Sequence, residues 1–105
     1  MPALLKFHHD KNGGHHHVIL ENVKDKHVSV GLTSKSKKRH NSTNYKCETD
    51  VLGNGKMSFL RRQGTVDSMT NYDSPRSAKM TEKDYAQAKM YGERAKQKYL
   101  NKRKK

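Results

Sequence analysis

The sequence contains no tryptophan, only one cysteine and two prolines, and no long hydrophobic run. A single cysteine cannot form a disulfide within the chain, and it excludes a zinc site of the CxxC type. Cys47 is more typical of a half-buried strand thiol than of a nucleophile. The segment MPALLKFHHD lacks the apolar core of a signal peptide, and no run has transmembrane length. These absences predict a cytoplasmic protein that does not associate with a membrane.

Acidic residues are also scarce, because 10 Asp and Glu stand against 23 Lys and Arg, which gives a net charge of +13. A domain with this balance gains affinity for a polyanion by releasing counterions from its phosphates. We therefore expect RNA or single-stranded nucleic acid as the partner. The alternative is a highly charged surface that only keeps the protein soluble.

Short segments with strand-like patterns occupy the first two thirds of the chain, and Gly- and Asn-containing turns separate them. Only 30% of the residues are hydrophobic, which allows a modest core in one small domain over residues 1–100, followed by a basic tail at residues 101–105. The pattern predicts an α+β fold, with a strongly bent five-stranded antiparallel sheet or a small barrel and one C-terminal helix. The expected strands are residues 3–9, 16–21, 27–34, 44–48 and 56–62, and residues 63–78 are expected to be irregular.

The expected helix begins after Thr81, which is a good N-cap residue, and Asp84 occupies the capping-box position three residues later. A narrow stripe of aromatic and small side chains then recurs at steps of three and four residues. Small residues in this stripe would let the helix lie close to the sheet. The stripe consists of Tyr85, Ala88, Gly92, Ala95 and Tyr99.

The strand at residues 27–34 ends in two hydroxyl side chains, Thr33 and Ser34, and a basic loop follows at once. A rigid strand that runs into a cationic loop can present side chains to phosphate groups. We expect the nucleic acid to bind to this loop and to the C-terminal tail. The residues concerned are Lys35, Lys37, Lys38, Arg39 and His40 in the loop and Lys102 and Arg103 in the tail.

Arg61 and Arg62 leave the fifth expected strand together, and two guanidinium groups can clamp a phosphate and stabilise a pentavalent transition state. The alternative is that this arginine pair holds the local turn by binding Asp67 or Asp73. His17 is an acid/base candidate because the pKa of an imidazole lies near neutrality.

Five histidines, His8, His9 and residues 15–17, flank the turn at Gly13 and Gly14. Adjacent histidines on a strand point to opposite faces, and Asp10 is the only carboxylate nearby, so we expect neither a metal site nor a cofactor.

The order of these motifs resembles the MazF/PemK family of endoribonuclease toxins, which are small SH3-like β-barrels with a C-terminal helix. The segment Val28-Ser29-Val30-Gly31-Leu32-Thr33-Ser34-Lys35 is similar to the family's apolar strand that ends in Leu-Thr-Ser. The run from Arg61 to Asp67 resembles its Arg-Thr-Val-Asp pattern, with two extra residues between Arg and Thr. The family's early Arg-Pro pair is replaced here by His16 and His17.

This resemblance implies metal-independent cleavage of single-stranded RNA. It assigns the phosphate clamp and proton transfer to Arg61 or Arg62, and an orienting hydroxyl to Thr33 or Ser34. It also implies an acidic antitoxin as a protein partner, and it leaves a homodimer open. The alternative function is a non-catalytic nucleic-acid-binding or host-nuclease-inhibiting protein of a phage, plasmid or conjugative element.

Overall fold

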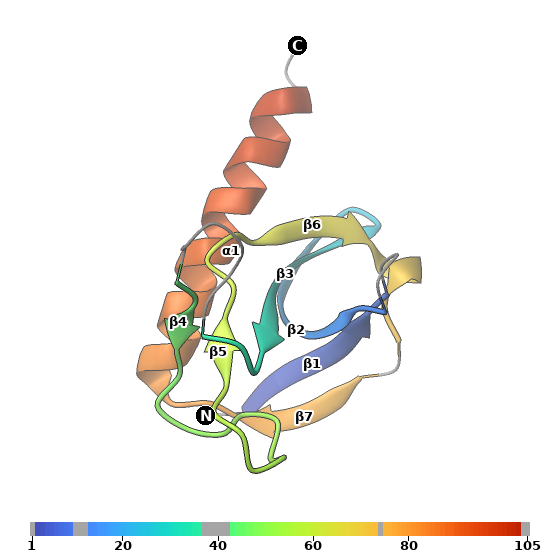
Figure 1. The fold of residues 1–105 in the computed structure, drawn as a ribbon. Coiled ribbons are helices and arrows are strands. Elements are labelled where there is room, and N and C mark those ends of the chain that lie inside the picture. The colour runs from blue at the N-terminus through green and yellow to red at the C-terminus, as the bar shows by residue number, and fades with distance from the viewer. Residues whose placement is uncertain (1, 10–12, 37–42, 74, 104–105) are drawn as a thin grey trace.

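The computed structural model describes residues 2–9, 13–36, 43–73 and 75–103, and within them it contains seven antiparallel strands and one long C-terminal helix (Figure 1). A short 3-10 helix, η2 (Met69–Asn71), precedes the last strand. The strands are β1 (Pro2–His8), β2 (His15–Val23), β3 (Lys26–Thr33), β4 (Tyr45–Lys46), β5 (Phe59–Leu60), β6 (Thr65–Ser68) and β7 (Arg76–Lys79), and the helix is α1 (Glu82–Arg103).

Strand β3 is the centre of the sheet, whose order is β4-β5-β3-β2-β1-β7. One edge of β3 pairs with β2, and the other edge is shared by β6 at its beginning and β5 at its end. The sheet bends strongly, but β4 and β7 stand at opposite ends of this order and do not pair, so the described sheet is open (Figure 1). The predicted α+β fold with a bent antiparallel sheet and one helix is confirmed, whereas a closed barrel is wrong.

The structure has two more strands than the sequence predicts, because β6 and all of β7 except Lys79 lie in residues 63–78, which were expected to be irregular. Their side chains are half-buried or exposed, so the segment shows no alternating hydrophobic pattern. Pairing with β3 and β1 supplies the order that the local sequence does not.

The hydrophobic core lies between α1 and one face of the sheet. Leu5, Val18 and Val30 are paired across β1, β2 and β3, so their side chains form a row on this face. Ala88 and Tyr91 of α1 pack on the same cluster. The pleat therefore sends the odd-numbered residues of β3 to the opposite face of the sheet.

Helix α1 begins as expected, since the Thr81 hydroxyl accepts a hydrogen bond from the Asp84 amide at 3.1 Å. The Asp84 carboxylate does not complete a capping box. It is fully buried and accepts hydrogen bonds from the Tyr45 hydroxyl at 3.1 Å and the Glu48 amide at 2.8 Å. Asp84 thus ties the start of α1 to the β4 segment.

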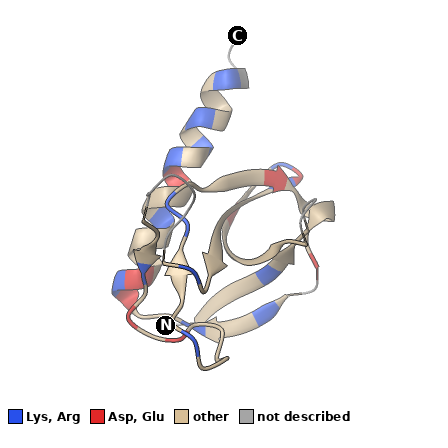
Figure 2. Ribbon diagram, viewed as in Figure 1, with Lys and Arg blue, Asp and Glu red and all other residues tan. Residues whose placement is uncertain are grey.

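The C-terminal half of α1 projects beyond the sheet (Figure 1). The helix continues to Arg103, so the expected basic tail is helical up to that residue. Lys and Arg recur along this half, and no acidic residue follows Glu93 in the sequence (Figure 2). Within the described part of the chain, no helix has the length and apolar character needed to cross a membrane.

Candidate nucleic-acid interface

A buried polar cluster covers the face of the sheet opposite to α1. The His17 Nδ1 lies 2.9 Å from the Ser29 hydroxyl, which lies 2.8 Å from the Tyr72 hydroxyl. Ser29 is fully buried, and His17 is only 5% exposed. The hydrogen bonds compensate for the burial of these polar groups, so the cluster acts as a second, polar core.

His8 extends this cluster towards the surface. Its ring centroid lies 4.6 Å from that of His17, and its Nε2 lies 2.7 Å from an oxygen of the Asp67 carboxylate. Burial acts to raise the pKa of Asp67, but hydrogen bonds from His8, the Ser68 amide and the Asn71 side chain outweigh it and lower the pKa below its usual value. Asp67 is therefore an ionised partner that orients His8.

The buried His27 lies on the same face of β3. The Lys6 ammonium donates to its Nε2 at 3.0 Å, so Nδ1 carries the proton and donates to the Asn22 carbonyl oxygen at 2.7 Å. Burial, assisted by the positive charge of Lys6, lowers the pKa of His27. The contacts thus require a neutral imidazole in one tautomer.

Gly31 lets two of the predicted site residues come together. A Cβ atom at this position would lie 3.0 Å from the Arg61 Cδ and 3.3 Å from the His17 Nε2, so a larger residue would push both side chains outwards by a few tenths of an ångström. The Arg61 amide also donates to the Gly31 carbonyl at 2.9 Å. Arg61 and His17 therefore both lie beside Gly31.

The predicted hydroxyl groups lie at the end of the same strand. Thr33 follows Gly31 by two residues and is half-buried on the same face, but its hydroxyl accepts the Lys35 amide at 3.2 Å. Ser34 and Lys35 are exposed. The other loop candidates, Lys37, Lys38, Arg39 and His40, lie outside the described residues.

Arg62 is directed away from Arg61 and towards α1. Its Nε donates to the Thr43 carbonyl at 2.7 Å, and its Nη1 donates to the Tyr91 hydroxyl at 2.9 Å. This guanidinium bridges the end of the basic loop to the helix. The alternative that the arginines hold the local structure applies to Arg62, but its partners are not the expected ones. Among the described residues, neither arginine pairs with Asp67 or Asp73, whose carboxylates lie against His8 and His9.

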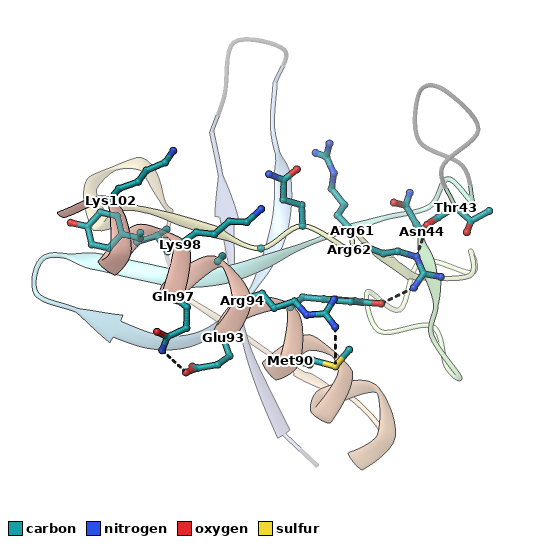
Figure 3. Close-up of a pocket in the computed structure, with 16 residues that line it drawn as sticks. Thr43, Asn44, Arg61, Arg62, Met90, Glu93, Arg94, Gln97, Lys98 and Lys102 are labelled. Atoms are coloured by element: carbon teal, nitrogen blue, oxygen red, sulfur yellow. Dashed lines mark hydrogen bonds between the residues drawn. The ribbon is translucent and has the colours of Figure 1, made fainter. Parts of the chain in front are cut away.

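An open groove of about 1050 Å³ lies between α1 and residues 61–66 and is called the α1 groove from here on (Figure 3). Among the described residues, Glu93 is the only carboxylate in its lining, and it accepts a hydrogen bond from Gln97 at 3.1 Å. Apolar groups of Gly64, Val66 and Ala95 also line the groove. The cationic lining residues are Arg61, Arg62, Arg94, Lys98 and Lys102.

Sequence reasoning identified Lys102 but missed Arg94 and Lys98. Their spacing of four residues from one another is visible in the sequence, and it places them on one side of a helix. The groove could not be anticipated, because its other wall belongs to residues 61–66, which the sequence did not place beside the helix. Arg103, the other tail candidate, is the last residue of α1.

Other reactive groups do not form a separate centre in the described part of the chain. No three His, Cys, Asp or Glu side chains of that part are arranged to hold a metal ion. Cys47 is buried, and burial together with the charge of Asp84 raises the pKa of its thiol to about 12. A thiol with this pKa is not ionised at neutral pH, so Cys47 is not an activated nucleophile.

No known family model matches the chain, and neither the curated proteins nor the solved structures contain a match.

Proposed function

We propose that this chain is a basic RNA-binding protein whose ligand lies in the α1 groove. The observation that carries the proposal is the convergence of five cationic side chains on one hollow that contains a single carboxylate. Phosphate contacts dominate the affinity of such a surface, because each one releases counterions from the nucleic acid. The aromatic and apolar lining favours a single strand, whose bases are free to pack against it.

The test compares two double charge reversals that change the net charge equally. Arg94→Glu with Lys98→Glu alters the groove, whereas Lys83→Glu with Lys89→Glu alters cations of the same helix that do not line it. Each lost phosphate contact lowers the affinity about tenfold, which corresponds to the lower end of the free energies typical of hydrogen bonds to charged groups. We expect the groove variant to bind a labelled RNA about 100-fold more weakly in fluorescence anisotropy, and the control to bind almost normally. Equal losses in both variants would contradict the placement of the ligand in the groove.

A second proposed function is cleavage of the bound RNA without a metal ion, and it is favoured by the contact of Arg61 and His17 with Gly31. The 2′-oxygen of the strand would attack phosphorus, forming a bond to O2′ and breaking the bond to O5′. His17 would accept the proton of the 2′-hydroxyl, Arg61 would balance the developing charge, and the leaving oxygen would take a proton from water.

This cleavage is tested with purified protein, mixed-sequence RNA and excess EDTA. We expect products with 2′,3′-cyclic phosphate and 5′-hydroxyl ends, and no cleavage of DNA, which lacks the nucleophile. Arg61→Ala should abolish cleavage, whereas Arg76→Ala, which removes an arginine of β7 outside the groove, should not. Intact RNA with binding retained would reject the enzyme and leave the non-catalytic RNA-binding alternative.

A further inference from the structure

Three cations of α1 form a row along the α1 groove. Arg94, Lys98 and Lys102 follow one another at intervals of four residues, and all three line the groove. Four residues of an α-helix advance about 6 Å and turn about 40° beyond one full turn. The side chains therefore lie one after another along the groove instead of forming a compact cluster, as the projecting half of the helix shows (Figure 3).

The cations of the row differ from those on the other sides of the helix. Lys96 forms an ion pair with Glu21 on β2 at 2.8 Å, and Lys89 lines a separate small pocket beside Leu20 and Glu21. Among the described residues, no carboxylate pairs with Arg94, Lys98 or Lys102. A phosphate that binds to the row thus does not have to displace a carboxylate of the protein.

The inner end of the row faces the arginines of the opposite wall. Arg94 lies along the groove towards Arg62, whereas Lys98, Lys102 and Arg61 extend to the same side of the molecule (Figure 3). The backbone of Arg61 is fixed by its hydrogen bond to Gly31. Arg62 is already engaged with the Thr43 carbonyl and the Tyr91 hydroxyl, so Arg61 is the freer phosphate ligand on this wall.

The groove floor beside the row is apolar. Gly64 lies directly against the backbone of Tyr91 and the methyl group of Ala95, and Val66 and Tyr99 line the groove as well. A strand whose phosphates follow the row would place its bases on this floor. Base packing on aromatic and apolar side chains is tolerant of sequence, because every base has a flat face.

We propose that Arg94, Lys98 and Lys102 are a phosphate track for consecutive phosphates of a bound strand, and that Arg61 holds a further phosphate. The rise of about 6 Å along the helix axis between neighbouring positions of the row is comparable to the distance between adjacent phosphates of a nucleic-acid strand. The track rests on the proposed RNA-binding function and extends it, because it defines a ligand of about four phosphates, near the lower limit of single-strand sites.

The track is tested with the full-length protein and labelled oligouridylates of increasing length. We expect the affinity to rise with each added phosphate up to about five nucleotides and then to level off. The logarithm of the binding constant for the pentanucleotide should fall with the logarithm of salt concentration with a slope of about −3, since each single-strand phosphate contributes roughly −0.7.

Single substitutions then separate the track from general attraction. Lys98→Glu should weaken binding of the pentanucleotide about tenfold and leave the dinucleotide almost unchanged, because a short ligand can avoid Lys98. Lys89→Glu, the control with the same change of charge, should follow the wild-type length dependence. Lys98→Gln should give an intermediate loss, and helical circular dichroism verifies that each variant is folded.

The outcomes distinguish this inference from the function on which it rests. If no oligonucleotide of any length bound, the RNA-binding function itself would be rejected. If oligonucleotides bound but Lys98→Glu and Lys89→Glu lost the same affinity at every length, RNA binding would stand and the track would be refuted. An affinity that is already maximal for the dinucleotide would also refute the track.

Discussion

At the scale of single residues, His27 makes the stability of the fold sensitive to acid. Its two hydrogen bonds require a neutral imidazole, and burial, assisted by the charge of Lys6, lowers its pKa below the ordinary value of 6.5. The unfolded chain therefore binds more protons than the folded protein in the pH window just below 6.5. Stability is highest above this window and falls as the pH decreases through it.

We predict that the free energy of unfolding decreases between about pH 7 and pH 5, and that His27→Gln reduces this dependence. The remaining pH dependence comes from other groups such as His16. Burial lowers the pKa of His16, and the charges of Arg76 and His15 lower it further. Urea unfolding at a series of pH values measures the effect. An unchanged slope in His27→Gln would contradict this assignment.

The buried carboxylate of Asp84 is the second residue with a predicted effect. Asp84→Asn leaves one oxygen to accept a hydrogen bond and turns an amide donor towards the Tyr45 hydroxyl or the Glu48 amide. Leaving a buried donor without an acceptor costs about 1–3 kcal/mol, so we expect a loss of this size in thermal or urea unfolding. Glu82→Gln, in the exposed first turn, should have little effect. Equal stabilities of the two variants would mean that Asp84 does not tie α1 to β4.

At the scale of elements, the position of α1 depends on close contacts at glycines. A Cβ atom at Gly64 would lie 2.7 Å from the Tyr91 carbonyl oxygen, which is part of the helix backbone. At Gly92 a Cβ atom would lie 2.3 Å from a terminal methyl group of Leu20, which can rotate away. The first clash can be relieved only by moving the helix away from residues 61–66, and this movement would widen the α1 groove.

We therefore predict that Gly64→Ala lowers stability by about 1–3 kcal/mol, the usual cost of overpacking. Gly92→Ala should cost less, because alanine in a helix regains roughly 0.5–1 kcal/mol relative to glycine. Thermal unfolding of the two variants measures the difference, and anisotropy shows whether Gly64→Ala also weakens RNA binding. A larger loss in Gly92→Ala than in Gly64→Ala would contradict the packing described for α1.

The elements also show how far the sequence determines the fold. The alternation of Val28, Val30 and Leu32 and the Thr81 cap predicted β3 and α1, because these signals are local. Strands β6 and β7 could not be predicted, since their polar residues acquire strand geometry only by pairing with β3 and β1.

The candidate site was likewise only partly predictable from the sequence. Arg61 and His17 were identified by residue type, but their contact with Gly31 and the opposite direction of Arg62 depend on tertiary packing.

At the scale of the whole molecule, the excess of positive charge is distributed unevenly. The face opposite to α1 carries histidines and hydroxyl groups in a hydrogen-bonded cluster, whereas the described cations of the α1 groove have a single carboxylate among them. The bent sheet therefore serves as a rigid support, and Gly31 places Arg61 where the histidine cluster meets the groove. This arrangement joins the proposed RNA-binding groove to the proposed centre for cleavage.

The most direct test of RNA binding in the α1 groove is a map of the surface that RNA contacts. Backbone amide signals of 15N-labelled protein are followed by nuclear magnetic resonance during titration with a short single-stranded RNA. The account predicts that the largest shifts occur at residues 61–66 and 90–102, with little change at β7 and at the start of α1. Shifts concentrated on β7 and residues 50–56, or spread evenly over all cationic residues, would contradict it.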